Sequence, residues 1–330
     1  MSEIQKKYIA YKNIIDNKII SFIEKTTPGS LYQPIKYILA GGGKRIRPVL
    51  LMFACEAVGG NPENAIDAAL AVEILHNFTL IHDDIMDNAS FRRGRETIHK
   101  KWNENIAILA GDNMVGLAFQ SLLETKSQRI QEIAKEFTKG IIEVCEGQSY
   151  DKEFEARKDV TIEEYIFMIN KKTSKLLEVC TGIGALIGNA DDKKYSALKN
   201  YALNLGIAFQ IQDDLLDISG DEKKFGKKIG GDIIEGKKTY LLLNALNMVN
   251  KEPDRKKILE IIENNGLKTY NKDIIDNIRR IYNEYGVVKV SQIEIKNYTK
   301  EAEKYLDVLE TPGSKEILKW FSRMLLGRSF

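Results

Sequence analysis

Residues 70–87 read LAVEILHNFTLIHDDIMD, and residues 201–217 read YALNLGIAFQIQDDLLD. Each stretch is an apolar run with helical spacing that ends in three aspartates with the pattern DDxxD. At about 100° per residue, the first and last aspartates of each pattern lie about 40° apart on one helix face. Packing like charges so closely is destabilising, and the chain does so twice, 130 residues apart. This repetition at the ends of two apolar helices favours a functional site over a solvated helix end.

Proline is scarce around these two stretches. The chain of 330 residues has six prolines, and none lies between Pro62 and Pro253. Because proline removes a backbone donor and clashes with the preceding turn of a helix, a long proline-free segment suits long helices. Apolar residues recur at helical spacing, and no segment alternates convincingly with a period of two. We therefore predict an all-α protein.

The predicted helices follow one another along the whole chain. After an N-terminal helix that ends before a break at 26–30, they cover residues 47–58, 62–88, 106–125, 128–151, 162–187, 194–218, 236–250, 254–264, 272–285, 287–308 and 313–326. Thr161 precedes one of them and Glu164 follows three residues later, which is the spacing of a capping box. Two polar segments, 88–97 and 219–236, interrupt the pattern directly after the aspartates. No linker is evident, and we expect a single domain over residues 1–330.

The charge balance and the cysteines exclude several classes of protein. Lys and Arg number 49 and Asp and Glu 47, for a net charge of +2. This balance argues against nucleic-acid binding through bulk basicity and against an acidic disordered tail. The three cysteines form no CxxC pair, so neither a disulfide framework nor a zinc site is indicated. The N-terminus lacks the apolar run of a signal peptide, and the uncharged runs are too short to span a bilayer. We expect a cytoplasmic protein without a membrane span.

The aspartate clusters match the chemistry of magnesium and diphosphate. Mg²⁺ is bound through one or two carboxylates together with the phosphate oxygens of a substrate. Basic side chains follow each cluster, namely Arg92 and Arg93 after the first and Lys227, Lys228, Lys237 and Lys238 after the second. A basic pair alone is usually surface charge. Guanidinium groups bind phosphate oxygens in pairs, so beside a metal-binding cluster we expect these side chains to contact a ligand.

Two further segments are polar within the helical pattern. Residues 41–48, GGGKRIRP, combine glycines that let the backbone approach an anion with the start of a helix. Their spacing is not that of a P-loop. Residues 170–175, NKKTSK, break the apolar stripe of their helix. They form either a solvated turn or a kink that exposes Lys172 and Thr173 to a cavity.

Together these motifs resemble one enzyme family. GGGKRIRP, LIHDDIMDNASFRRG, KKT, FQIQDDLLD and FGKKIGGDIIEGKKT follow one another over about residues 40–240. This set resembles the trans-isoprenyl diphosphate synthases, or polyprenyl synthetases, and most of all their archaeal-type short-chain geranylgeranyl diphosphate synthases. The resemblance implies an all-α, isoprenoid synthase-type bundle of long helices around a deep central cavity, usually in a homodimer. It also implies a Mg²⁺-dependent reaction, with up to three ions, that joins isopentenyl diphosphate head to tail to dimethylallyl, geranyl or farnesyl diphosphate.

The resemblance assigns roles to individual residues. The metal ligands would be Asp83, Asp87, Asp213 and Asp217, with Asp84 and Asp214 in support. The allylic diphosphate or the leaving pyrophosphate would be held by Arg92, Lys172, Thr173, Gln210 and Lys227. The isopentenyl diphosphate site would comprise Gly43, Lys44, Arg47, His76 and Arg93, with Lys237 as a further substrate-binding residue. The catalytic set would be Asp83, Asp84, Asp87, Arg92, Lys172, Thr173, Gln210, Asp213 and Lys227.

Product length should depend on what closes the cavity. Phe78 lies five residues before Asp83, with Thr79 beside it, which places it about 7.5 Å along the helix axis. An aromatic here ordinarily packs in the core, but the combination resembles the geranylgeranyl synthases, so we expect a twenty-carbon product. The nearest alternatives are a medium-chain synthase, hexaprenyl for example, and a farnesyl synthase. A non-catalytic partner subunit, a terpene cyclase and a ligand-free helical bundle are alternatives of other classes.

Overall fold

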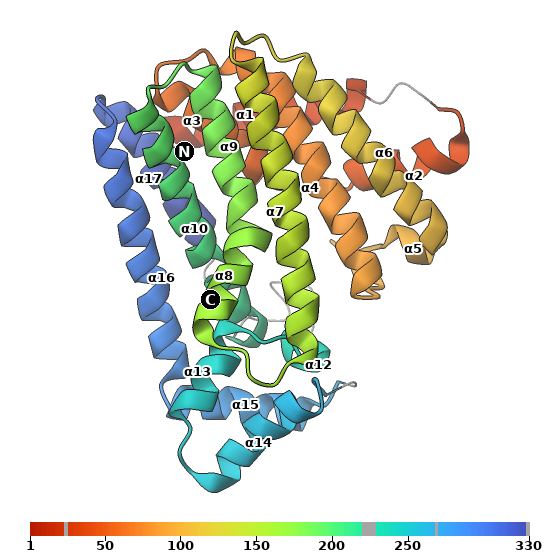
Figure 1. The fold of residues 1–330 in the computed structure, drawn as a ribbon, viewed down its shortest axis with the longest axis vertical. Helices are drawn as coiled ribbons and strands as arrows, with labels where there is room; N and C mark the ends of the chain where they lie inside the picture. Colours follow the sequence, from red (N-terminus) through yellow and green to blue (C-terminus); the bar gives the residue numbers. More distant parts are fainter. Residues whose placement is uncertain (23–25, 220–228, 268–269, 328–330) are drawn as a thin grey trace. The chain divides into compact units, whose positions relative to one another are not determined.

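A computed structural model describes residues 1–22, 26–219, 229–267 and 270–327. These residues are almost entirely helical (Figure 1), which confirms the predicted all-α class. They form two compact units. The first comprises Met1–Lys139, Leu176–Lys199 and Leu306–Phe321, and the second comprises Gly140–Lys175, Asn200–Tyr305 and Ser322–Phe330.

The first unit is built around α4 (Ile66–Met86). Its other complete elements are α1 (Glu3–Phe22), α2 (Gly29–Leu39), α3 (Ile46–Ala57), η1 (Pro62–Ala65), β1 (Phe91–Arg92), β2 (Arg95–Glu96), α5 (Ile98–Lys101) and α6 (Glu104–Leu123). It also takes in parts of α7 (Ile130–Ala156), α9 (Lys175–Ile187), α10 (Asp192–Ser219), η3 (Tyr305–Val308) and α17 (Pro312–Leu326).

Close packing fixes α4 within this unit. It packs along α6 and against α3 and α1, and most of its residues before Leu80 are buried. Small residues let the helices approach, since a Cβ atom on Gly111 of α6 would lie 2.3 Å from His82 Nε2. In the same way, a Cβ atom on Gly184 of α9 would lie 2.3 Å from Leu51 O of α3. The C-terminal end of α4 is therefore held by a dense core.

The second unit contains the remaining elements. They are the rest of α7 and α10, α8 (Ile162–Ile169), the π-helical turn η2 (Asn170–Ser174), α12 (Gly231–Glu235), α13 (Tyr240–Met248), α14 (Glu252–Glu263), α15 (Lys272–Glu284) and α16 (Val287–Lys304). α13, α14 and α15 lie beside one another (Figure 1), and one apolar core joins them. A second core joins α8, the middle of α10 and α13 around Tyr165, Ile211 and Leu243. The second aspartate pattern follows directly from this core on α10.

Most helices start and end within a few residues of their predicted bounds. The capping box is present, with Glu164 N donating to Thr161 Oγ1 at 3.1 Å and Thr161 N donating to Glu164 Oε2 at 2.9 Å. The helix predicted over 162–187 is interrupted by η2. The helix predicted from residue 236 begins at Tyr240, because Thr239 caps that end. α2 is not among the predicted helices, since Pro34 lies inside it, where proline argues against a helix.

One described helix, α6, is long and apolar enough to cross a membrane by length and composition alone, with a mean hydropathy of 1.5 over 18 residues. Core helices of globular proteins have the same length and composition. α6 packs against α4 and α2 within the first unit, and 39% of the residues in this window are buried.

Candidate active site

The first aspartate pattern lies at the C-terminal end of α4. Asp84 is 2% exposed, whereas Asp83 and Asp87 are half-buried. Arg92 Nε donates to Asp84 Oδ1 at 2.6 Å, and Arg92 Nη2 donates to Asp83 Oδ2 at 3.4 Å. Burial raises the pKa of Asp84 to about 6, although the Arg92 charge opposes the rise. An arginine thus fixes the buried middle carboxylate, with two more exposed carboxylates beside it.

A tight hairpin delivers Arg92 to this position. β1 and β2 pair Phe91 with Glu96 and Arg92 with Arg95. The two loop residues, Arg93 and Gly94, have φ values of 52° and 73°. Two consecutive positive φ angles are the mark of a type I′ turn, which matches the twist of a two-stranded ribbon. The basic segment that the sequence places between helices is therefore an ordered turn that sends its arginines in different directions.

Arg93 reaches the glycine-rich loop at 41–44. Its Nη1 donates to Gly42 O at 2.6 Å. A Cβ atom on Gly43, whose φ is 144°, would lie 3.2 Å from Arg93 Nη1, so the loop is close to the guanidinium. The hydroxyl of Tyr8 on α1 donates to Lys44 O. The predicted isopentenyl residues Gly43, Lys44 and Arg93 therefore lie together.

Arg47 and His76 complete this group. Arg47 Nη1 lies 3.1 Å from His76 Nε2. Because a guanidinium only donates, Nε2 accepts and the ring proton belongs on Nδ1. Burial and the positive charges of Arg47 and Arg93 hold the pKa of His76 well below its usual value. The imidazole is therefore neutral, and its one N–H can serve as a donor.

The second aspartate pattern, on α10, is supported by uncharged donors. Asp214 is buried, Asp213 is exposed and Asp217 is half-buried. Three groups donate to Asp214: Gln210 Nε2 at 2.9 Å, the Tyr165 hydroxyl at 2.6 Å and the Tyr240 backbone N–H at 3.3 Å. Burial raises the pKa of Asp214 to about 7, while these hydrogen bonds lower it.

Lys172 and Thr173 lie in the π-helical turn η2. Thr173 Oγ1 donates to Gln210 Oε1 at 2.8 Å, and Lys172 Nζ donates to Asp151 Oδ2 at 2.5 Å. Thr173 is buried, which excludes the solvated turn that the sequence leaves open. Two glycines pack against η2. A Cβ atom on Gly147 of α7 would lie 2.3 Å from Lys172 N, and one on Gly206 of α10 would lie 2.5 Å from Ser174 Cα. Thr173, Gln210 and Asp214 thus form one hydrogen-bonded chain.

Asp217 contacts the short helix α12. Asp217 Oδ2 accepts from Asp232 N at 3.1 Å. Burial raises the pKa of Asp217 to about 6. Lys237 pairs with Glu235 at 2.6 Å, and Lys238 is buried and donates to the carbonyls of Glu155 and Gly236. Lys227 and Lys228 lie outside the described residues.

The two residues expected to set product length lie on α4. Phe78 is buried, and its ring meets that of His82 edge-on with centroids 4.7 Å apart. Thr79 Oγ1 donates to His76 O at 2.8 Å. Phe78 therefore packs one turn before the aspartates, against the histidine that precedes them.

Sequence reasoning missed two residues that hold this site. Tyr165 lies 49 positions from Asp214, and Asp151 lies 21 positions from Lys172. Neither residue belongs to a motif quoted from the sequence. The only available signal is the place of Tyr165 on the apolar face of α8, which indicates burial but not a partner.

The donor chemistry of both patterns fits Mg²⁺. Carboxylate oxygens are the ligands that this ion prefers, and it takes its remaining ligands from water and substrate phosphates. Among the residues that the structure describes, no three His, Cys, Asp or Glu side chains converge on one point. Such a partial ligand set suits an ion that is bound together with its substrate.

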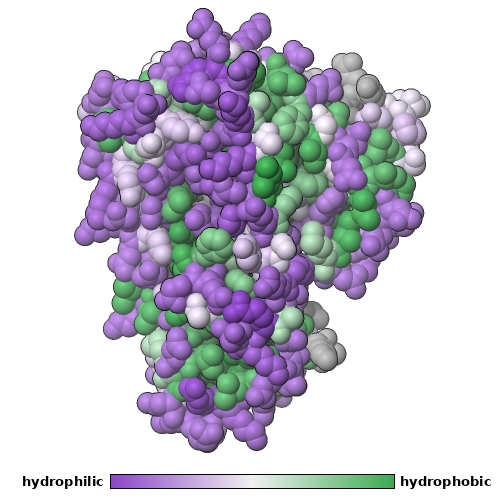
Figure 2. All heavy atoms as spheres, viewed as in Figure 1, coloured by the Kyte–Doolittle hydropathy of each residue, from purple (hydrophilic) through white to green (hydrophobic). Residues whose placement is uncertain are grey.

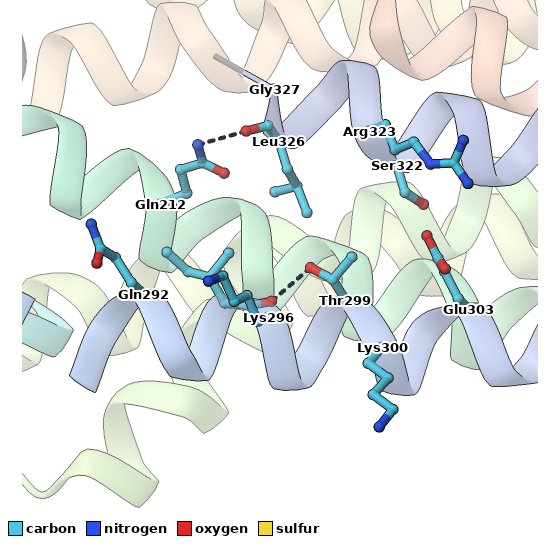
Figure 3. Close-up of a pocket in the computed structure, with 11 residues that line it drawn as sticks. Gln212, Gln292, Lys296, Thr299, Lys300, Glu303, Ser322, Arg323, Leu326 and Gly327 are labelled. Atoms are coloured by element: carbon cyan, nitrogen blue, oxygen red, sulfur yellow. Dashed lines mark hydrogen bonds between the residues drawn. The ribbon is translucent and has the colours of Figure 1, made fainter. Parts of the chain in front are cut away.

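A groove in the second unit is lined by none of the predicted site residues. It has a volume of about 640 Å³ and is lined by α16, the end of α17 and Gln212 of α10 (Figure 3). Gln212 Nε2 donates to Leu326 O at 2.7 Å across its inner end. In the first unit, a cavity of about 20 Å³ lies among Tyr37, Asp84, Arg92 and Arg93.

The sequence of the chain matches those of known proteins. The polyprenyl synthetase family model matches residues 28–280. The geranylgeranyl diphosphate synthase of Methanosarcina mazei is 38% identical over 318 residues, which cover 96% of this chain and 95% of the relative.

Two solved structures have the same fold. A crystal structure of geranylgeranyl pyrophosphate synthase superposes with a TM-score of 0.91 at 38% identity and covers 100% of both chains. A polyprenyl synthase from Caulobacter crescentus, complexed with calcium and isoprenyl diphosphate, superposes with a TM-score of 0.86 at 25% identity, covering 98% of this chain and 95% of that one. These matches confirm the resemblance drawn from the motifs. The chain belongs to the polyprenyl synthetase family.

Proposed function

We propose that this chain condenses isopentenyl diphosphate with allylic diphosphates and releases geranylgeranyl diphosphate. One observation carries the proposal: in both DDxxD patterns the middle aspartate is buried and hydrogen-bonded, while the first and last are more exposed. A solvated helix end would expose all three carboxylates. The family, together with the names of the M. mazei relative and of the first solved structure, supports the reaction and the product.

The proposal assigns metal binding to the more exposed carboxylates. Asp83, Asp87, Asp213 and Asp217 would hold Mg²⁺, and Asp84 and Asp214 would orient them. The calcium and isoprenyl diphosphate in the C. crescentus structure support a divalent ion. Bound Mg²⁺ supplies positive charge that stabilises a departing diphosphate.

The basic and polar side chains then divide between the two substrates. Arg92, Lys172, Thr173, Gln210 and Lys227 would hold the allylic diphosphate, and Gly43, Lys44, Arg47, His76 and Arg93 would hold isopentenyl diphosphate. Lys237 is a further candidate, although it pairs with Glu235. The neutral His76 suits a site crowded with arginines, because it can donate to a phosphate oxygen without adding charge.

The reaction proceeds by ionisation, condensation and elimination. The allylic C–O bond breaks and its electron pair leaves with pyrophosphate, whose charge the basic side chains stabilise electrostatically. The double bond of isopentenyl diphosphate supplies the electrons of the new C–C bond. A proton then leaves the neighbouring carbon and goes to the released pyrophosphate, so no nucleophilic serine or cysteine is needed.

The direct test supplies the purified chain with isopentenyl diphosphate, Mg²⁺ and, in separate reactions, dimethylallyl, geranyl and farnesyl diphosphate. We expect a twenty-carbon product from each starter, loss of turnover on chelation and its return on adding Mg²⁺. No product from any starter would contradict the proposed reaction. A product that stops at fifteen carbons or extends to thirty would favour the farnesyl or hexaprenyl alternative.

The product length is tested at Phe78. Truncation of this buried ring to alanine should lengthen the product, because it removes a large side chain one turn below the aspartates. Phe53→Ala is the matched control, since Phe53 is another buried phenylalanine, which packs on Tyr11 and Phe321 of the same unit. Product lengths are read by chromatography after dephosphorylation. An unchanged length in Phe78→Ala would show that another residue closes the cavity.

The proposal also covers assembly and location. We propose a cytoplasmic homodimer with the whole of residues 1–330 acting as one synthase domain, which the full coverage of the solved structure supports.

Leu109 and Leu123 of α6 are 56% and 60% exposed, and green, hydrophobic residues lie along this helix in Figure 2. A second copy would cover this face. Sedimentation should give a dimer that Leu109→Lys converts to a monomer, and calorimetry should give a single unfolding transition.

A further inference from the structure

Arg45 is a buried arginine between the glycine-rich loop at 41–44 and the first residue of α3, Ile46. It is 4% exposed, and its backbone has a φ of 50° at the N-cap of α3. This left-handed conformation is uncommon for a residue with a Cβ atom, so its surroundings must hold it in place.

Three parts of the first unit bind the guanidinium. Nε donates to Asp16 Oδ1 of α1 at 2.7 Å, Nη1 donates to Glu73 Oε1 of α4 at 2.6 Å, and Nη2 donates to Leu39 O at the end of α2 at 3.2 Å. Glu73 is itself 2% exposed. A buried carboxylate and a buried guanidinium require each other, because either one alone would be an uncompensated charge in the core.

Glu73 extends this network along α4. Asn77 Nδ2 donates to Glu73 O at 2.8 Å and to Glu73 Oε1 at 3.4 Å. His76 follows Glu73 by three residues, so the two side chains lie on neighbouring positions of one helix face. Arg45 at the N-cap of α3 and Arg47 in its first turn therefore contact α4 at neighbouring positions, Arg45 at Glu73 and Arg47 at His76.

We infer that Arg45 is a positioning residue for the isopentenyl diphosphate site. Held by Asp16 and Glu73, it fixes the register of the loop against α4 and thereby aims the neighbouring Lys44 and Arg47. It does not touch substrate itself, because its side chain is 4% exposed and each of its three nitrogens donates to a group inside the protein. This inference rests on the proposed function, which assigns Lys44, Arg47 and His76 to isopentenyl diphosphate.

The test separates the two substrates kinetically. Arg45→Lys and Glu73→Gln should raise the KM for isopentenyl diphosphate by about tenfold, the lower end of the 10–100-fold that the loss of an outer-shell partner costs at metal sites. The KM for the allylic diphosphate should change much less, because the described partners of Arg45 and Glu73 include none of the proposed allylic residues. Arg129→Lys is the matched control, since Arg129 pairs with Glu132 and the Ala190 carbonyl of the same unit outside this loop.

The outcomes distinguish the inference from the proposed function. A wild-type chain that does not condense isopentenyl diphosphate overturns the proposed function. A wild-type chain that does, with Arg45→Lys and Glu73→Gln variants that keep the isopentenyl KM or raise both KM values equally, overturns only the inference. If Glu73→Gln does not fold, Asp16→Asn replaces it, because Asp16 is the more exposed partner of Arg45. Thermal unfolding, followed for every variant, shows that the kinetic change belongs to a folded protein.

Discussion

The two aspartate patterns are identical in spacing but differ in what holds their buried carboxylate. Asp84 is held by the positive charge of Arg92, and Asp214 by a tyrosine hydroxyl, a glutamine amide and a backbone N–H, all neutral. Burial raises the pKa of both carboxyls, to about 6 for Asp84 and to about 7 for Asp214. Among the described contacts, the buried carboxylate of the first pattern is therefore held by a positive charge and that of the second by neutral donors.

This difference should change how strongly the structure of each pattern depends on a bound cation. A charge-compensated cluster can keep its shape without a cation, because Arg92 already neutralises one carboxylate. The three neutral donors of Asp214 add no positive charge to the second pattern, and a bound ion would supply it. We therefore expect the second pattern to depend more strongly on metal for its order than the first.

The largest effect should come from removing a proposed ligand in either pattern. Asp87→Ala and Asp213→Ala should each lower kcat by about 10²–10³-fold, as the loss of one electrostatic contact to developing charge does elsewhere. Steady-state assays over a range of Mg²⁺ concentrations measure the effect. If one variant kept wild-type turnover at every Mg²⁺ concentration, its pattern would not bind the ion.

Removal of the supporting groups should have a smaller effect and reveal the asymmetry. Arg92→Lys and Tyr165→Phe should lower kcat by about 10–100-fold, the usual range for groups that orient ligands. Arg92→Lys should lie at the upper end, because Arg92 also has a proposed substrate contact. Tyr165→Phe leaves a buried carboxylate oxygen short of one donor, which costs about 1–3 kcal/mol of stability. Urea unfolding measures that loss.

Metal should rescue the two supporting variants unequally. High Mg²⁺ should restore much of the stability of Tyr165→Phe. The positive charge of the bound ion would stabilise the negative charge of the carboxylates in place of the lost hydroxyl donor. Arg92→Lys keeps its positive charge and should gain less. Equal rescue of both variants would contradict the contrast between a charged and a neutral support.

The smallest effect is expected at Asp151, the partner of Lys172. Asp151→Asn keeps an oxygen that can accept from Lys172 Nζ but removes the charge. The KM for the allylic diphosphate should change by no more than a few-fold, since a hydrogen bond is kept. Lys171→Gln is the control, because Lys171 pairs with Glu146 on the surface of the same unit. A fall in kcat of more than about 100-fold would give Asp151 a part in the chemistry beyond the usual range for orienting groups.

The sequence predicts the helical fold and the aspartate patterns because both depend on local spacing. The Thr161 capping box and the long α4 and α10 follow from neighbours within a few residues. The hairpin at 91–96 was not predictable, since its turn consists of Arg93 and Gly94 rather than the asparagine or aspartate with glycine that signals type I′.

The contacts of Tyr165 and of Arg45 could not be predicted from the sequence, for two different reasons. Tyr165 and Asp214 are partners only because the core of the second unit brings α8 against α10. No spacing rule connects positions 49 residues apart. Arg45 belongs to the GGGKRIRP motif, yet its side chain points into the protein. Its backbone there is left-handed, and the residue types of the motif do not predict that conformation at an arginine.

The close packing of two glycines against the π-helical turn η2 limits which substitutions the chain tolerates. Gly147 and Gly206 pack against it so closely that even a methyl group would overlap main-chain atoms. Random mutagenesis aimed at new product lengths should therefore recover almost no survivors with substitutions at these two positions. Neither glycine carries any chemistry, yet both should be as intolerant of mutation as the aspartates. A library that spares these two codons would search the permitted variants of this enzyme more efficiently.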